Sequence, residues 1–233
     1  MELQGKNAVI TGLSKGIGRA CAEKLLEKGV NVAGWGQTPP PYQHSNLHFF
    51  ETDVKDEASV KNSAQKTLKT FNNEVHILIN NAGLGYFGLF EELPVEQYKE
   101  MMQTNVDGVF YVTRHLIPPM KKLGTGHIIN LSSIAGLQSN AQTGLYSATK
   151  YAVTAITESL FKELREDGIK VTGIHPGSVK TNFFDNAPAI DAHDYMMKPT
   201  EIADTIVHTL EAPDNYLINQ VVMRPLQPKG PQK

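Results

Sequence analysis

The chain has 233 residues, of which 40% are hydrophobic and 20% are charged, so it can bury the core of one sizeable domain. The formal net charge is −2 and the basic residues are scattered, which argues against a nucleic-acid partner. No run approaches the ~18 apolar residues of a membrane span, and the opening residues do not resemble a signal peptide. We therefore expect a cytoplasmic protein without a membrane partner.

Short apolar runs alternate with helical periodicity along nearly the whole chain. We expect strands at residues 7–11, 31–35, 47–51, 76–80, 127–132, 170–174 and 217–223. The intervening stretches have room for helices of about 15 to 30 residues, which is the spacing of βαβ units. These features predict one α/β domain at residues 1–226, with a doubly wound parallel sheet of about seven strands and helices on both faces. Residues 227–233 are expected to form a C-terminal tail.

Three glycines stand between the first expected strand and the first helix, in the pattern T-G-x-x-x-G-x-G. Gly12, Gly16 and Gly18 would let the backbone turn tightly and approach a pyrophosphate, whose charge a helix N-terminus favours. Glycines at such a turn can also serve close packing alone. Because the first βα turn of a doubly wound sheet is where dinucleotides bind, we favour a nucleotide site.

The helix expected near residues 95–123 carries more apolar surface than one face of a sheet usually needs. Core packing would explain this surface. A second subunit packed against the helix would explain it equally well and would make the protein a homodimer or a homotetramer.

Tyr146 and Lys150 are four residues apart in GLYSATKYAV, a stretch without a helix breaker after Gly144. On a helix, this spacing places both side chains on one face, a turn apart. Taken alone, the pair is typical of a half-buried tyrosine beside a solvated lysine. A phenol titrates near ~10 and a nearby cation lowers its pKa, so the pair could also exchange protons.

The glycine turn and the Tyr–Lys pair occur together with other motifs. These are TGLSKGIG (11–18), DV (53–54), NNAG (80–83), Asn105 in QTNVDG, Ser133 in NLSSIAG, YSATK (146–150) and HPGSVKT (175–181). In these motifs and their spacing the sequence resembles the short-chain dehydrogenase/reductase family, and it is similar to the ketoacyl-reductase-like branch. The resemblance covers nearly the whole chain and implies a Rossmann-like fold, a nicotinamide cofactor and a small-molecule substrate.

The resemblance also assigns the chemistry to Asn105, Ser133, Tyr146 and Lys150. Tyr146 is the expected general acid and base, while Lys150 lowers its pKa and bonds the nicotinamide ribose. The Ser133 hydroxyl holds the substrate oxygen. Ser132 is the competing assignment, but Ser133 aligns with the catalytic serine of the family. Asn105 joins a water-borne proton relay behind Lys150.

The cofactor contacts follow from the same resemblance and from the strand ends. An acidic residue after the second strand would favour NAD, but Gly36 and Gln37 stand there, and Lys15 could pair with a 2′-phosphate. We therefore expect NADP(H), with NAD remaining possible. Asp53 and Val54 are expected to flank the adenine. The expected contacts are Gly12, Ser14, Lys15, Gly16, Ile17, Gly18, Gln37, Asp53, Val54, Asn81, Ala82, Gly83, Tyr146, Lys150, Pro176, Gly177, Val179 and Thr181.

We thus expect an NADP(H)-dependent oxidoreductase that interconverts a ketone and a secondary alcohol. The ketone could be a 3-keto acid, a ketoacyl derivative or a similar small carbonyl compound. The alternatives are an NAD-dependent alcohol or polyol dehydrogenase and a dinucleotide-sensing module without catalysis. Cys21 is the only cysteine, and we expect it to be a small residue of the core. No two histidines have the spacing that is typical of metal ligands. We expect no metal ion.

Two segments should shape the substrate site, LGYFGLFEEL (84–93) and residues 182–198. The second is long for a connection and holds apolar residues such as Phe183 and Phe184. We expect it to be a lid or binding loop that excludes water. A small satellite core under a static loop is the alternative.

Overall fold

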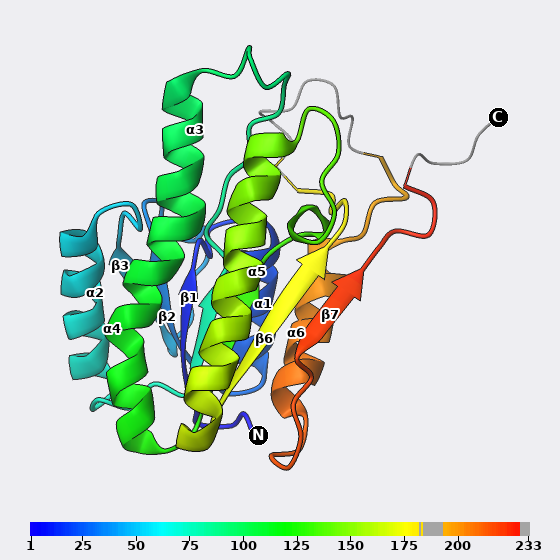
Figure 1. Ribbon diagram of the computed structural model, residues 1–233. Helices are drawn as coiled ribbons and strands as arrows, with labels where there is room; N and C mark the ends of the chain where they lie inside the picture. Colours follow the sequence, from blue (N-terminus) through cyan, green and yellow to red (C-terminus); the bar gives the residue numbers. More distant parts are fainter. Residues whose placement is uncertain (182, 184–192, 229–233) are drawn as a thin grey trace.

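All seven expected strands are present, and they pair in parallel in one sheet. The computed structural model describes residues 1–181, 183 and 193–228 (Figure 1). The strands are β1 (Asn7–Thr11), β2 (Asn31–Gly36), β3 (Leu47–Glu51), β4 (Ile77–Asn80), β5 (Gly126–Leu131), β6 (Ile169–Pro176) and β7 (Gln220–Met223). Only β7 begins clearly later than expected. The Ile218 carbonyl before it accepts a hydrogen bond from the Thr172 hydroxyl rather than from a backbone amide.

The strand order is β3-β2-β1-β4-β5-β6-β7, which confirms the doubly wound topology. The chain moves outward from β1 to β3, returns to the centre at β4, and then moves outward in the other direction. The connections that follow β1 and β4 therefore diverge at the carboxyl ends of these neighbouring strands. Doubly wound sheets bind their ligands in a crevice at this point.

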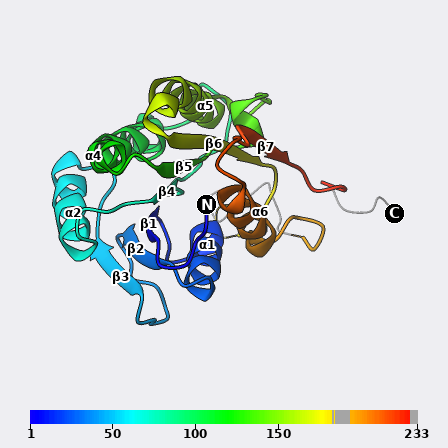
Figure 2. The same cartoon turned by 90° about the horizontal axis from the view of Figure 1, so that it is seen from below.

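Helices cover both faces of the sheet, as Figure 2 shows. On one face lie α1 (Gly16–Glu27) and α6 (Pro199–Glu211), and on the other lie α2 (Glu57–Thr70), α4 (Gly108–Leu123) and α5 (Gly144–Leu164). Three of these helices are shorter than the expected minimum of about 15 residues, with 12 in α1, 14 in α2 and 13 in α6. For α1 the difference arises because the glycine turn takes up part of the connection.

The helix expected at residues 95–123 is not one regular α-helix. It consists of α3 (Val95–Met102), a π-helical segment (Gln103–Asp107) and α4. The wider π-helical turn contains Asn105, whose side chain bonds the backbone of Leu84 instead of facing solvent. The hydrogen bonds between the Asn105 side chain and Leu84 explain why the α-helix is interrupted by a π-helical turn at this residue.

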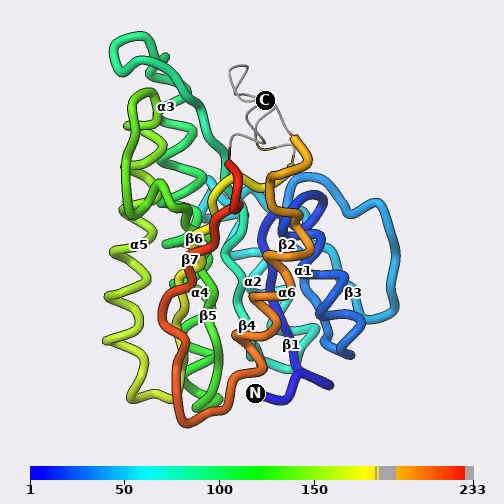
Figure 3. The backbone as a smooth tube through the Cα atoms, turned by 90° about the vertical axis from the view of Figure 1, so that its right-hand side faces the viewer, coloured from blue at the N-terminus to red at the C-terminus, as the bar shows by residue number. Residues whose placement is uncertain are grey.

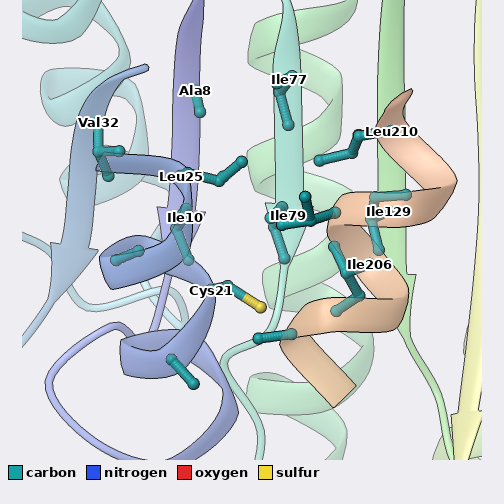
Figure 4. Close-up of a cluster of buried hydrophobic side chains, with 14 of the residues drawn as sticks. Ala8, Ile10, Cys21, Leu25, Val32, Ile77, Ile79, Ile129, Ile206 and Leu210 are labelled. Carbon is teal, nitrogen blue, oxygen red and sulfur yellow. The ribbon is translucent and has the colours of Figure 1, made fainter. Parts of the chain in front are cut away.

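The two faces of the sheet are buried in separate cores. Figure 4 shows the core beneath α1 and α6, where Ile10 and Ile79 lie with Leu25 and Ile206. Cys21 belongs to the same core and is a buried free thiol, as expected. Leu78 lies between Ile77 and Ile79 in sequence and joins the opposite core, because successive side chains of a strand point to opposite faces.

The N-terminus is tied to the far end of α6, away from the carboxyl ends of the strands (Figure 3). The Met1 ammonium group donates to the carbonyls of Leu210 and Ala212 at 2.8 and 3.0 Å. Within the described ranges, no helix combines the length and the apolar character needed to cross a membrane. The expected tail is described only as far as residue 228.

Candidate active site

A cavity of about 620 Å³ opens at the carboxyl ends of the strands. Its walls come from the connections after β1, β2, β3, β4, β5 and β6 and from the first two turns of α5. Nearly all of the expected site residues meet there. Those that line the cavity are Gly12, Ser14, Lys15, Gly16, Ile17, Gln37, Asp53, Val54, Asn81, Ala82, Gly83, Ser133, Tyr146, Lys150, Pro176, Gly177, Val179 and Thr181.

The glycine turn is fastened to the connection after β4. Asn81 donates from its side-chain amide to the carbonyls of Thr11 and Gly12, while the Thr11 hydroxyl accepts from the amides of Asn81 and Ala82. Gly12 has a φ of +70°, which favours glycine. Gly18 does not line the cavity. A Cβ there would collide with the Gly12 carbonyl and the Asn81 amide, so its absence permits close packing of α1 on the turn.

Helix α1 begins at the cavity wall without a capping side chain. Lys15 is the N-cap residue and makes no side-chain hydrogen bond to the first turn, and Gly16 and Ile17 both line the cavity. The first N–H groups of a helix need partners from outside the helix, and the helix dipole favours an anion there. The turn therefore fits a phosphate group, as the glycine pattern predicts.

The far end of the cavity has no acidic residue directly after β2. Gly36, Gln37 and Thr38 line it there, and Asp53 and Val54 line it after β3. The Asp53 carboxylate accepts a hydrogen bond from the backbone amide of Lys55, within its own turn. An adenosine-sized group would meet neutral side chains where β2 ends.

Tyr146 and Lys150 lie on one side of α5, and both are buried. The Lys150 ammonium donates to the Leu131 carbonyl at 2.9 Å, and its Nζ lies 5.9 Å from the centroid of the Tyr146 ring. Ser133 caps the short helical turn after β5, and its hydroxyl is close enough to the phenol of Tyr146 to affect the pKa of that phenol. The spacing of four residues thus brings a phenol, a hydroxyl and an ammonium group to one end of the cavity.

Burial dominates the proton affinity of both residues of the pair. It raises the pKa of the Tyr146 phenol well above its ordinary value, and the neighbouring Ser133 hydroxyl offsets only part of this rise. Burial also lowers the pKa of Lys150 to about 8. The expectation of a lowered pKa for Tyr146 is therefore wrong for this arrangement, in which burial of the phenol outweighs the effect of the nearby ammonium.

Asn105 lies behind the cavity wall rather than on it. Its side-chain oxygen accepts from the Leu84 amide, and its NH₂ group donates to the Leu84 carbonyl and to the Thr149 hydroxyl. The Thr149 hydroxyl in turn donates to the Tyr146 carbonyl. Asn105 thereby joins the connection after β4 to the helix that carries Tyr146 and Lys150.

The connection after β6 completes the site. The Ser133 hydroxyl lies 3.4 Å from the Pro176 carbonyl, and the Ser133 carbonyl lies 3.3 Å from Nδ1 of the buried His175. A Cβ on Gly16 would stand 3.5 Å from Thr181, so this connection approaches the glycine turn across the cavity. Asn182 and residues 184–192 lie outside the described residues, and with them Phe184 and most of the expected lid.

Some lining residues were not individually predicted, among them Phe87, Lys55 and Glu100. The ring of Phe87 packs against Tyr146, and so does that of Phe183, which the sequence placed in the expected lid. The apolar character of residues 84–93 indicated a substrate-shaping segment, but no spacing identified Phe87. No sequence signal pairs Lys55 with Glu100. Within the described part of the chain, no group of three or more His, Cys, Asp or Glu residues is arranged to hold a metal ion.

Comparisons with known proteins agree with this arrangement. A family model described as short chain dehydrogenase matches residues 6–190. An uncharacterised oxidoreductase of Staphylococcus haemolyticus is 34% identical over 236 residues, covering 97% of this chain and 99% of the relative.

Two solved structures share the whole architecture. An alcohol dehydrogenase from the archaeon Thermococcus sibiricus, complexed with 5-hydroxy-NADP, has a TM-score of 0.86 at 26% identity and covers 99% of this chain and 100% of its own. A 3-ketoacyl-(acyl-carrier-protein) reductase from Brucella melitensis, complexed with NADH, has a TM-score of 0.87 at 25% identity, with 97% and 99% covered. The chain therefore belongs to the short-chain dehydrogenase family. It is an oxidoreductase with a Rossmann-like fold.

The low pKa of Lys150 predicts an unusual dependence of stability on pH. Above pH 8 the folded state releases this proton, whereas the unfolded chain keeps it until about pH 10.4, so the unfolded state binds more protons and stability rises with pH. Between pH 8 and 9.5, wild type should gain about 1.5 kcal/mol in unfolding free energy relative to Lys150→Met. Urea unfolding of the protein without ligand measures this difference.

Lys162→Met is the matched control, because Lys162 is exposed on the same helix. It should keep the wild-type dependence on pH. Parallel curves for wild type and Lys150→Met would contradict the assignment of a buried, weakly basic lysine.

Proposed function

We propose that this protein is an NADP(H)-dependent oxidoreductase that interconverts a small ketone and a secondary alcohol, with Tyr146 as the general acid and base. One observation carries the proposal. The neighbouring hydroxyls of Ser133 and Tyr146 stand at one end of a cavity whose other walls are the glycine turn and the ends of β2 and β3. Two hydroxyl groups that can donate to a carbonyl oxygen and a turn that can bind a phosphate group thus line the same cavity.

The residues present fit a nicotinamide dinucleotide. The uncapped start of α1 suits a pyrophosphate, and the cavity volume of about 620 Å³ lies within the range of cofactor sites. The contacts expected from the sequence are proposed as its binding residues, with Asp53 and Val54 beside the adenine. Gly18 serves this site by allowing α1 to pack closely. No metal ion is required for the proposed reaction.

In the direction of reduction, the bound cofactor would supply a hydride to the carbonyl carbon and leave in its oxidised form. The hydroxyls of Ser133 and Tyr146 hold the carbonyl oxygen and stabilise the negative charge that develops on it. Tyr146 then transfers its proton to that oxygen, which completes the secondary alcohol. The raised pKa keeps the phenol protonated at neutral pH, as an acid must be before it donates.

Lys150 and Asn105 assist this proton transfer without binding the substrate oxygen. The Lys150 ammonium is held by the Leu131 carbonyl beside the phenol, where its charge would stabilise a phenolate after proton transfer. Asn105 holds the connection after β4 against Thr149 of α5. We propose that it positions the pair and takes part in resupplying the proton.

The preference for NADP(H) rests on two features of the cavity wall. Lys15 lies in the glycine turn and is available to pair with a 2′-phosphate. The residues after β2, Gly36 and Gln37, offer no carboxylate to repel that phosphate or to bind a 2′-hydroxyl. The fold itself does not decide, because the two structural relatives hold an NADP derivative and NADH.

We also propose that the protein is cytoplasmic and forms a homodimer or a homotetramer. Phe110 of α4 and Tyr151 of α5 are 50% and 45% exposed, which is high for large aromatic side chains on neighbouring helices. Covering them with a second copy would remove apolar surface from water.

Tyr146→Phe keeps the ring that packs on α5 and removes only the proton. We expect a folded protein that binds NADPH but turns over at least ~100-fold more slowly, the scale on which a general acid contributes. Energy transfer from Trp35, the only tryptophan, to bound NADPH measures binding, and absorbance at the nicotinamide band measures turnover. Near-normal turnover would contradict the assignment.

Lys15→Ala should weaken the binding of NADP(H) by about 10- to 100-fold and leave that of NAD(H) nearly unchanged, because a charge-assisted contact to the 2′-phosphate is lost. Titration with both cofactors measures this. Arg19→Ala, which removes a neighbouring charge paired with Glu23 outside the cavity, is the control and should change neither affinity. Equal losses with both cofactors would give Lys15 a structural role instead.

A further inference from the structure

Two phenylalanine rings enclose the phenol of Tyr146. The centroid of the Tyr146 ring lies 5.3 Å from that of Phe87 and 5.5 Å from that of Phe183, and the two phenylalanine rings are 6.1 Å apart. Both phenylalanines line the cavity. Gly85 makes room for them, because a Cβ there would stand 2.7 Å from the ring of Phe183 and 3.0 Å from that of Phe87. The wall beside the reacting hydroxyls is therefore aromatic.

Among the described residues that line the cavity, this end has no cation that is not already hydrogen-bonded. Their only cationic side chains are Lys15, Lys55 and Lys150. Lys15 belongs to the glycine turn, and Lys150 is bonded to the Leu131 carbonyl. Lys55 Nζ lies 3.6 Å from the Glu100 carboxylate and 4.0 Å from that of Asp53.

The remaining polar groups near the aromatic wall are neutral or acidic. Asn140 and Thr143 line the cavity close to the start of α5, and Glu100 accepts a hydrogen bond from the Tyr86 hydroxyl. A substrate carboxylate would lose its water here and would find only a cation that is already hydrogen-bonded, which is unfavourable.

We infer that the site takes uncharged ketones that carry an apolar, preferably aromatic, group beside the carbonyl, and that it discriminates against 3-keto acids and other carboxylates. The apolar group packs on Phe87 and Phe183 while the carbonyl oxygen meets Ser133 and Tyr146. Ring edges and faces of the two phenylalanines suit a planar group. This inference rests on the proposed function, and it selects among the ketones that the proposed function allows.

Matched pairs of ketones test the inference with wild-type protein and NADPH. One pair is 4-methylacetophenone and 4-acetylbenzoate, and the other is ethyl acetoacetate and acetoacetate. Within each pair the carbonyl is the same and the charge differs. We expect kcat/KM to be at least about tenfold higher for the neutral member of each pair, with most of the difference in KM.

Phe87→Arg places a cation on the aromatic wall and should shift the ratio of kcat/KM toward 4-acetylbenzoate by about tenfold or more. Phe90→Arg is the matched control, because Phe90 belongs to the same connection, is 73% exposed and does not line the cavity. It should keep the wild-type ratio. Energy transfer from Trp35 to NADPH verifies that both variants are folded and bind cofactor.

Binding without turnover gives a second readout. The neutral ketones should raise the melting temperature of Tyr146→Phe loaded with NADP⁺, and the carboxylates should not. If the carboxylates are reduced as well as the neutral ketones, or better, the inference is overturned and the proposed function stands. If the protein binds NADPH but reduces no carbonyl compound in either pair, with either cofactor, the proposed function itself is contradicted and the inference falls with it.

Discussion

The buried ammonium of Lys150 is the constraint on which the arrangement of the site depends. Its Nζ donates to the Leu131 carbonyl at the end of β5, and its own backbone carbonyl accepts from the Ser132 hydroxyl. A Cβ on Gly136 would collide with that hydroxyl and press on the Lys150 carbonyl, so a side chain there would separate α5 from β5. A buried charge without a partner is costly, so any shift of α5 that broke the hydrogen bond between Lys150 and the Leu131 carbonyl would be unfavourable. This hydrogen bond therefore holds α5 in register with β5.

That register brings Tyr146 close to Ser133. The burial of the Tyr146 phenol that results determines the pKa values of the site. Phe87 and Phe183 exclude water from the phenol, and burial holds its pKa high while it lowers that of Lys150 to about 8. The pKa values of the acid and the cation are thus shifted apart, and the phenol stays protonated at neutral pH. A protonated phenol is the starting point that proton transfer to a developing alkoxide requires.

The fold could be predicted from the sequence because its strands are short apolar runs buried on both faces and separated by helical stretches. The glycine turn and the Tyr146–Lys150 spacing are local patterns, and the residues they indicated gather at one cavity with the exception of Gly18. The direction of the pKa shift at Tyr146 could not be predicted, since it depends on rings from Phe87 and Phe183, far apart in the sequence. The π-helical break at Asn105 depends likewise on its contact with Leu84, a residue outside the helix.

The central claim is that the cavity carries out hydride transfer between a nicotinamide and a carbonyl carbon held by Ser133 and Tyr146. The most direct measurement uses NADPH with deuterium at either C4 position and 4-methylacetophenone as acceptor, followed by mass spectrometry of the alcohol. We expect deuterium at the carbinol carbon from only one of the two labels, and almost no product with Tyr146→Phe. Alcohol that carries no deuterium from either label, or unchanged formation of labelled alcohol by Tyr146→Phe, would contradict the account.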